Sequence, residues 1–465
     1  MKKEYRTESD YIGELAVEKN ALYGIQSLRA KNNFNVLDRP MSFTFVKNVT
    51  LIKKAAAIVN GSYGFLDKNK AEAIVASCDE ILSNKHRKEF IVGALQGGAG
   101  TSANMNVNEV IANLAIERLN GEKGDYSVIH PNDHVNMEQS TNDVIPTAGK
   151  LTVLTLCREL LAALASLKVA LEDKAAEFYG ILKIGRTQLQ DAVPMRLGQS
   201  FGAFASAIGR DVERIGRALA EMRVINLGGT AIGTAINVKK QYFDHITEKL
   251  SELFGEKLER AGNLFDGTQN LDCLVAVSGA LKALAVNLSK MCNDLRLMAS
   301  GPRAGLGEII LPARQNGSSI MPGKVNPVIP EVVNQVAFMV IGHDVTIALA
   351  AEAGQLELNA FEPVIFFQIF ESIRALTGAV NTLTENCIVG IRANAGRCAE
   401  WVDRSVGTVT ALNPYIGYKK AAEIAKESLQ TGESVKSIVL RQGILSEEQL
   451  KKILDPASLT EPGDN

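Results

Sequence analysis

One stretch of the chain constrains its fold more than any other, the run from residue 269 to 299. Its large apolar residues follow one another at alternating spacings of three and four, a heptad pattern sustained for three repeats. A helix of this length spans roughly 45 Å. We expect several neighbours to bury it in a bundle of long helices that other copies of the chain share. The seam consists of Leu274, Val277, Leu281, Leu284, Leu288, Met291 and Leu295, flanked by Ala276, Ala280, Ala283 and Val286.

Four further segments read as long helices, and each begins at a proline, which suits the first helical turn. The first 140 residues mix helix with glycine-rich loops, and the last part holds short helices, one starting at the capping box Ser446–Gln449. The sequence therefore predicts a mainly α protein with three domains. They are a mixed N-terminal domain (1–140), a central helical bundle (141–395) and a small helical C-terminal domain (396–465). The four helical segments are 146–178, 194–224, 330–356 and 363–393.

The composition excludes several classes of protein. The 465 residues carry 50 basic and 52 acidic side chains, without a basic stripe, so we expect no nucleic-acid partner. No window of 18 residues is both free of charge and apolar enough to span a bilayer, and the N-terminus lacks a signal-peptide core, so we expect a cytoplasmic protein without a membrane partner. Six scattered cysteines indicate reduced thiols, and no His/Cys cluster has the spacing of metal ligands.

Four loops share one design, because each is rich in hydroxyls, amides and free backbone N–H groups and runs into a helix N-terminus. Such helix ends favour anions. Each loop alone is more often a helix cap or a turn than a binding site, and the Gly-Gly-Ala-Gly stretch lacks the Gly-Lys-Ser/Thr ending of a phosphate loop. The loops are "QGGAGTSANMN" (96–106), "QSTNDVIPT" (139–147), "GRTQLQDAVP" (185–194) and "GSSIMPGKVNP" (317–327).

The loop at 317–327 gives the sharpest signal. It places Lys324 and Asn326 behind two serines on a backbone that glycine and proline interrupt. Permanent exposure of the adjacent Ile320 and Met321 is unfavourable, whereas a lid that buries them on closing is not. A purely structural loop is the alternative interpretation.

Together these motifs resemble the aspartase/fumarase superfamily, whose enzymes add or remove groups across the double bond of fumarate. The resemblance covers essentially the whole chain, and it implies a small mixed domain, a central five-helix bundle and a small helical C-terminal domain. It also implies a homotetramer whose active sites each draw on three subunits, and a small dicarboxylate or amino-acid substrate. Further matching motifs are "YGIQSLRA", "HPNDHVNMEQSTND", "NLGGTAIGT", "SGPRAGLGEI" and "LNPYIGY".

Within the superfamily, position 188 separates two chemistries. Fumarase-like sequences carry a histidine there, which serves a poor hydroxide leaving group, whereas an alkylammonium leaves as neutral ammonia without an acid. Gln188 hydrogen-bonds but cannot shuttle a proton. The resemblance thus predicts a carbon–nitrogen lyase of the aspartate ammonia-lyase (aspartase) branch, which converts L-aspartate to fumarate and ammonia. The alternatives are a class II fumarase and a catalytically retired structural member.

The resemblance also assigns roles to residues. Ser318 matches the base that removes a proton from C3 by way of an aci-carboxylate, and a serine in this role needs N–H donors to stabilise its anion. Lys324 is the second catalytic residue; with Asn326 and Thr187 it is expected to bind the α-carboxylate. The β-carboxylate is expected to contact Thr101, Ser140, Thr141 and Ser319. The amino group is expected to contact Asn142 and Gln188.

Three further residues lie outside these assigned roles. Arg29 resembles a supporting arginine of the substrate site, and His134 is expected to be structural or peripheral. Glu331 persists without a histidine partner, and the sequence offers no reason for it. The elimination requires no cofactor, and the resemblance leaves activation by a divalent metal undetermined.

Overall fold

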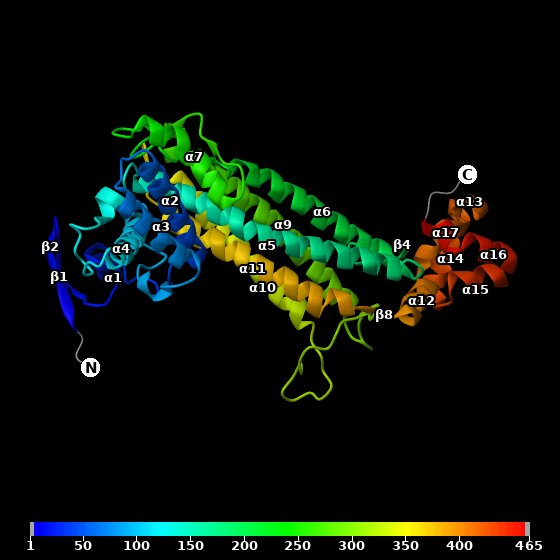
Figure 1. The fold of residues 1–465 in the computed structure, drawn as a ribbon. Helices are drawn as coiled ribbons and strands as arrows, with labels where there is room; N and C mark the ends of the chain where they lie inside the picture. Colours follow the sequence, from blue (N-terminus) through cyan, green and yellow to red (C-terminus); the bar gives the residue numbers. More distant parts are fainter. Residues whose placement is uncertain (1–3, 461–465) are drawn as a thin grey trace. The chain divides into compact units, whose positions relative to one another are not determined.

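The computed structural model describes residues 4–460 and is mainly α, as the sequence predicts (Figure 1). Contacts within the chain define two compact units. The predicted division into three domains stays a prediction. The first unit comprises Met1–Leu160, Glu213–Ala283 and Met339–Ala375, and the second comprises Leu161–Val212, Leu284–Phe338 and Leu376–Asn465.

Five long helices dominate the fold. The heptad seam is confirmed, since all seven of its residues in α9 are at most 1% exposed. Hydrogen bonds join α9 to two neighbours, from Ser278 to Asp344 of α10 and from Asn287 to Asp211 of α6. The five helices are α5 (Thr141–Glu177), α6 (Leu197–Glu221), α9 (Asp272–Met298), α10 (Val328–Glu352) and α11 (Glu362–Asn386).

Two of the predicted helix starts are wrong. Helix α5 begins at Thr141, so Pro146 lies inside it. Proline has no N–H for the carbonyl four residues earlier, and the Asn142 carbonyl instead accepts a hydrogen bond from Asn226 Nδ2 at 3.0 Å. Pro194 belongs to strand β4 rather than to α6. The prolines therefore lie within a few residues of the helix starts but do not mark the first residue of either helix.

Three helical segments are long and apolar enough to cross a membrane by length and composition alone: 272–298, 328–352 and 362–390. These segments do not meet the charge-free condition of the sequence analysis, because each carries charged residues. Their most apolar windows are 56%, 33% and 56% buried, respectively. Packing within the chain thus covers much of α9 and α11, whereas α10 keeps an exposed apolar stripe that includes Phe338, Val345 and Leu349.

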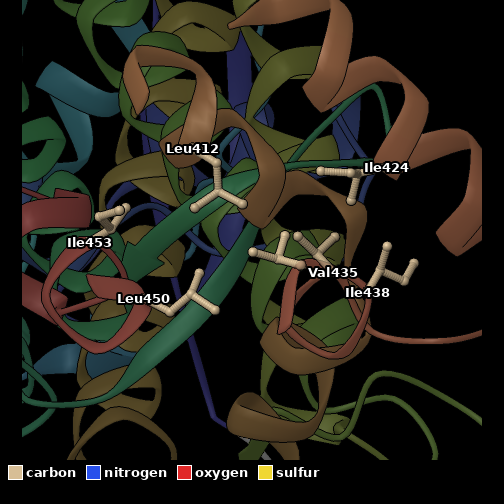
Figure 2. Close-up of a cluster of buried hydrophobic side chains, with 7 residues drawn as sticks. Leu412, Ile424, Val435, Ile438, Leu450 and Ile453 are labelled. Carbon is tan, nitrogen blue, oxygen red and sulfur yellow. The ribbon is translucent and has the colours of Figure 1, made fainter. Parts of the chain in front are cut away.

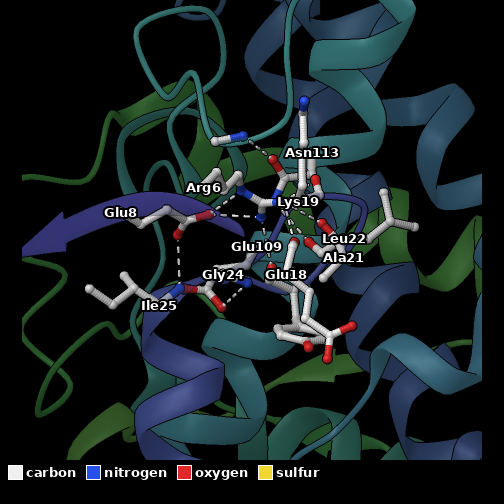
Figure 3. Close-up of polar contacts among 12 residues, drawn as sticks. Arg6, Glu8, Glu18, Lys19, Ala21, Leu22, Gly24, Ile25, Glu109 and Asn113 are labelled. Carbon is white, nitrogen blue, oxygen red and sulfur yellow. Dashed lines mark hydrogen bonds and ion pairs between the residues drawn. The ribbon is translucent and has the colours of Figure 1, made fainter. Parts of the chain in front are cut away.

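The first unit contains a hairpin and a set of shorter helices joined by buried polar contacts. Figure 3 shows Arg6 donating to a series of backbone carbonyls and pairing with Glu8, and Glu109 accepting from the N–H group of Gly24. Glu109 also accepts from the backbone N–H groups of Gln26 and Ser27 at the start of α1. These contacts fix the N-terminal segment on α4. The elements are β1 (Tyr5–Asp10), β2 (Gly13–Glu18), α1 (Ile25–Asn33), α2 (Phe43–Ser62), α3 (Lys68–Leu82), α4 (Thr101–Arg118), α7 (Lys240–Phe254) and α8 (Leu264–Gln269).

The second unit contains the antiparallel hairpin of β3 (Leu182–Thr187) and β4 (Gln190–Arg196) and the C-terminal helices. The latter enclose an apolar cluster that includes Leu412, Ile424, Ile438 and Leu450 (Figure 2). The predicted capping box at Ser446 is confirmed. The C-terminal helices are α12 (Ala395–Arg404), α13 (Asn413–Ile416), α14 (Tyr418–Thr431), α15 (Val435–Arg441), α16 (Glu447–Ile453) and α17 (Pro456–Thr460).

Short elements complete the chain. Two pairs of two-residue strands occur, one parallel (β5 with β6) and one antiparallel (β7 with β8). Segment η2 is a single turn of π-helix, and the other η segments are 3-10 helices. Their bounds are β5 (Val224–Ile225), β6 (Glu259–Arg260), β7 (Ile309–Ile310), β8 (Arg392–Ala393), η1 (Arg87–Glu89), η2 (Pro131–Val135), η3 (Ile388–Gly390) and η4 (Val406–Leu412).

Candidate functional site

The glycine-rich loop before α4 has the geometry of an anion-binding helix start. Gly98, Ala99 and Gly100 all have positive φ angles, of 86°, 51° and 82°, which turn the backbone sharply into Thr101, the first residue of α4. A Cβ atom on Gly100 would lie 2.8 Å from Ile145 Cγ2, so no larger residue fits there. Thr101 is exposed at this N-terminus, where the positive end of the helix favours a carboxylate, although the N–H groups of Thr101 and Ala103 already donate to the Gly98 carbonyl and to Gln96 Oε1.

The predicted residues 140–142 form the start of α5. Ser140 Oγ accepts a hydrogen bond from the N–H of Asn142 at 3.2 Å. Asp143 accepts from the N–H groups of Ser140 (2.9 Å), Gly228 (3.0 Å) and Thr230 (3.0 Å), which ties the loop at 228–230 to this helix end. Side chains 140 to 142 remain partly exposed, and two oriented hydroxyls therefore stand at a second helix N-terminus.

The structure brings the two helix starts together through a buried side chain. Asn104, one turn into α4, donates from Nδ2 to Thr141 Oγ1 at 3.2 Å. Thr101 and Thr141 thus belong to one neighbourhood, as expected for two residues that bind the same carboxylate.

Arg29 lies with Thr101 in the lining of a cavity of about 620 Å³. Its guanidinium forms two hydrogen bonds to the Asp10 carboxylate, at 2.8 and 2.9 Å, and one to the Gly13 carbonyl. The Arg29 hydrogen bond holds the pKa of Asp10 below its usual value. Most of the donors of Arg29 are therefore committed to the β1–β2 hairpin, whose tip residues Tyr11 and Ile12 are exposed beside the same cavity.

A buried charged layer beneath residues 140–142 was missed by the sequence reasoning. Lys53 is fully buried and donates to Asn136 Oδ1 at 2.7 Å and to Gln139 Oε1 at 2.9 Å. Burial lowers the pKa of Lys53 to about 7, although the Asp143 carboxylate acts in the opposite sense. Burial also raises the pKa of Asp143 to about 6. The available signal was a lysine inside an apolar helical run and a series of asparagines in α4.

Thr187 and Gln188 lie in the second unit, at the tip of the β3–β4 hairpin. Gln188 and Leu189 have φ angles of 55° and 63°, as in a two-residue turn that matches the strand twist. Both predicted residues are exposed. The hairpin is anchored by Arg186, whose Nη1 lies 2.7 Å from Oε1 of the fully buried Glu308.

The loop at 317–327 also belongs to the second unit and stands out from the helices before α10 (Figure 1). Its base is closed by hydrogen bonds from Gly317 N to the Lys324 carbonyl and from Asn326 Nδ2 to the Gly317 carbonyl, both 2.8 Å. Ile320 is 84% exposed, and the side chain of Lys324 is also exposed. The loop therefore has a fixed neck and an exposed apolar tip.

Ser318 is the most organised residue of this loop. Its Oγ accepts hydrogen bonds from the N–H groups of Ile320 (3.2 Å) and Met321 (3.0 Å). Two such donors stabilise an alkoxide relative to the neutral hydroxyl, and they are the donors that a serine base requires. Ser319 is exposed next to it.

The remaining sequence candidates have local explanations or none. His134 Nδ1 accepts from the His130 N–H at 2.8 Å, and Nε2 lies 3.2 Å from Lys70 Nζ, so both ring nitrogens are engaged. Glu331 lies in the first turn of α10, and nothing in the structure explains it. Between residues 4 and 460, no group of three or more His, Cys, Asp or Glu side chains is placed to hold a metal ion.

Comparisons with known proteins agree over the full length. A family model described as lyase matches residues 13–342, and one described as fumarase C C-terminus matches residues 409–461. A Bacillus sp protein named aspartate ammonia-lyase is 50% identical over 463 residues, which cover 100% of this chain and 99% of the relative. A protein of the same name from Helicobacter pylori (strain J99) is 51% identical over 459 residues, covering 98% of each.

Two solved structures share the fold. The first is a fumarate lyase:delta crystallin from Brucella melitensis bound to cobalt, with a TM-score of 0.96 and 49% identity, covering 99% of this chain and 100% of that one. The second is a recombinant class II fumarase from Schistosoma mansoni, with a TM-score of 0.95 and 33% identity over the same shares of the two chains.

Proposed function

We propose that this chain, which belongs to the aspartase/fumarase superfamily of lyases, acts as an aspartate ammonia-lyase and reversibly converts L-aspartate to fumarate and ammonia. The observation that carries the proposal is the identity of about half of all residues, over the whole length, with relatives that bear that name. Gln188 supports it, because a glutamine suits an ammonia leaving group and not a hydroxide.

In the proposed reaction Ser318 is the base. Its alkoxide, stabilised by the N–H groups of Ile320 and Met321, takes the proton from C3 and becomes a hydroxyl. The electron pair of the C3–H bond moves onto the neighbouring β-carboxylate, which becomes an aci-carboxylate with two negative charges. The pair then returns to form the C2–C3 double bond as the C2–N bond breaks, and neutral ammonia departs. Fixed donors around the β-carboxylate lower the barrier of the first step.

The donors are assigned as follows in this proposal. Thr101, Ser140 and Thr141 at the two helix starts donate to the β-carboxylate, together with Ser319 of the loop. The hydrogen bonds at 140–143 support this assignment because they fix that helix end. Thr187, Lys324 and Asn326 hold the α-carboxylate, and Asn142 and Gln188 contact the amino group. Arg29 supports the pocket by holding the β1–β2 hairpin through Asp10.

We also propose that the chain works as a homotetramer whose sites draw on three subunits. The support is the exposed stripe of α10, where Phe338, Val345 and Leu349 are 63%, 58% and 64% exposed at spacings of seven and four residues. Such a seam fits a partner helix. Analytical ultracentrifugation in buffer without detergent tests this, since a monodisperse monomer contradicts it, and a protein that needs detergent indicates lipid on the stripe instead.

The proposed elimination uses no cofactor. No step of the proposed mechanism is assigned to a metal. Cobalt is bound in the Brucella melitensis structure, so the effect of divalent metal on the rate remains a measurement to make. A cytoplasmic location is proposed as well, and six buried cysteines, all with free thiols, support a reducing compartment.

The test is a substrate comparison with purified protein. Incubation with L-aspartate is expected to give the ultraviolet absorbance of fumarate, and addition of ammonia to fumarate is expected to give the reverse reaction. Robust hydration of fumarate to malate without any deamination would reassign the chain to the fumarases. Absence of both reactions would support a retired structural member.

A further inference from the structure

A chain of partly buried hydrogen bonds leads from Lys53 to the predicted substrate residue Thr141. Lys53 Nζ donates to Asn136 Oδ1 at 2.7 Å, and the same oxygen accepts from Asn104 Nδ2 at 3.2 Å. Asn104 Nδ2 then donates to Thr141 Oγ1 at 3.2 Å. Lys53 and Asn104 are at most 1% exposed, and Thr141 stands at the open end of the chain.

The direction of every hydrogen bond in this chain is fixed at Asn136. The backbone carbonyl of Gln139 can only accept, so Asn136 must face it with its amide nitrogen, at 3.1 Å. The Oδ1 atom of Asn136 is then the atom that accepts from Lys53 Nζ. Since Asn136 presents an oxygen, Asn104 must face it with its NH2 group; the reverse orientation would place two acceptor oxygens against each other.

This orientation decides what the Thr141 hydroxyl does. Asn104 Nδ2 carries two hydrogens, and its two acceptors are Asn136 Oδ1 and Thr141 Oγ1. Thr141 Oγ1 is thereby an acceptor on its buried side. Its own O–H has no role in that bond and is free to donate on the exposed side.

We propose that Asn104 is a positioning residue that makes Thr141 a dedicated donor to a carboxylate of the substrate, with Lys53 as the anchor that orients Asn104 through Asn136. The inference rests on the proposed function, in which Thr141 binds the β-carboxylate. A donor that is already oriented needs no reorganisation when charge develops on that carboxylate, which is the condition for stabilising an aci-carboxylate.

A merely structural network would fill the same space, and the two readings differ in one substitution. Asn104→Asp keeps the shape but replaces the NH2 group by an acceptor. The Thr141 hydroxyl then turns inward to donate to the carboxylate and is lost to the substrate. Asn108→Asp is the matched control, because Asn108 Nδ2 also donates to Asn136 Oδ1, at 3.3 Å, while its other hydrogen bond goes to Met105 Sδ and not to Thr141. It adds the same charge to the same network.

The experiment is a double-mutant cycle on the full-length protein with Asn104→Asp, Thr141→Val and both together. Its readouts are kcat and KM for deamination of L-aspartate, and the affinity for succinate by titration calorimetry, which needs no turnover. Loss of a hydrogen bond to a charged group predicts a fall in kcat/KM of about 10- to 100-fold for Asn104→Asp. The same substitution is expected to cause no further fall in the Thr141→Val background.

Two results would overturn the inference: losses that multiply in the double variant, or an equal loss in Asn108→Asp. Should Asn104→Asp fail to fold, Asn104→Ala takes its place in the cycle. Asn104→Ala frees the Thr141 hydroxyl to rotate, so we expect a smaller fall in kcat/KM than for Asn104→Asp. In the Thr141→Val background this fall is again expected to disappear. A wild-type protein that does not deaminate L-aspartate refutes the proposed function, while the succinate cycle still decides the role of Asn104.

Discussion

Replacement of Lys53 by methionine should change how stability depends on pH. Lys53 is fully buried in α2, and burial lowers its pKa from the ordinary 10.5 to about 7. The charged groups that act on it are Asp143 of α5, which favours the ammonium, and the thiol of Cys78 in α3. Methionine has a similar length and no charge, so Lys53→Met removes the titration while it preserves most of the packing.

The sign and size of the effect follow from proton binding. Between pH 7 and pH 10.5 the unfolded chain holds a proton on Lys53 that the folded chain has released, so the free energy of unfolding rises with pH in that window. The gain from pH 7 to pH 9.5 is about 3 kcal/mol per chain. Asp143, with a pKa of about 6, titrates below the window. Lys53→Met should lack the gain, although it loses the bonds to Asn136 and Gln139 at every pH.

The assay is urea unfolding at several pH values from 7 to 9.5 with equal chain concentrations, because association would otherwise shift the midpoints. Subtracting the free energy of unfolding of the variant from that of the wild type at each pH cancels the contributions of the other titrating groups. Lys54→Met is the control, since Lys54 pairs with the exposed Asp79 at 2.6 Å and is not fully buried. If the free energies of unfolding of wild type and Lys53→Met change in parallel between pH 7 and pH 9.5, the lowered pKa of Lys53 is refuted.

Three further substitutions test other parts of the molecule. Ser318→Ala should abolish formation of fumarate while the circular dichroism and assembly stay unchanged; near-normal turnover would remove the serine base. Glu308→Gln should lower the free energy of unfolding by about 3–5 kcal/mol in urea, because it leaves buried Lys183 and Arg186 without their shared carboxylate; a loss below about 1 kcal/mol would contradict this. Ser446→Ala should cost about 1 kcal/mol by removing the capping box, measured by thermal unfolding, and an unchanged midpoint would argue against it.

The parts of the fold that sequence predicted well are those that a repeating pattern determines. The seam of α9 could be read because the residues at heptad spacing face one side of a helix, and each of them is buried. The helix starts were harder, because proline is compatible with several positions. At Pro146 the neighbouring Asn226 satisfies the carbonyl that proline leaves free, and that partner comes from 84 residues away.

The candidate site divides in the same way. The loops that carry Ser318 and Gln188 stand out by their composition, and the roles of the two residues are what the resemblance implies; these roles stay predictions. Lys53 and Asn104 were not found, because their importance depends on contacts between α2, α4 and the start of α5 that no local pattern encodes. Arg29 was predicted to support the substrate site, and the structure commits most of its donors to Asp10 and Gly13.

The proposed elimination makes opposite demands on its base and on its donors, and the chain meets them with different kinds of structure. A base must reach the C3 hydrogen and admit the substrate, and Ser318 lies on an exposed loop with a closed neck. Donors to a developing charge must already be in place, and Thr141 is held by a helix start and by a network anchored on the buried Lys53 and Asn104. A substitution that stiffens the loop should therefore reduce turnover, because Ser318 then reaches the C3 hydrogen less readily. A substitution that loosens the network below Thr141 should also reduce turnover, because the Thr141 hydroxyl is then no longer held in place.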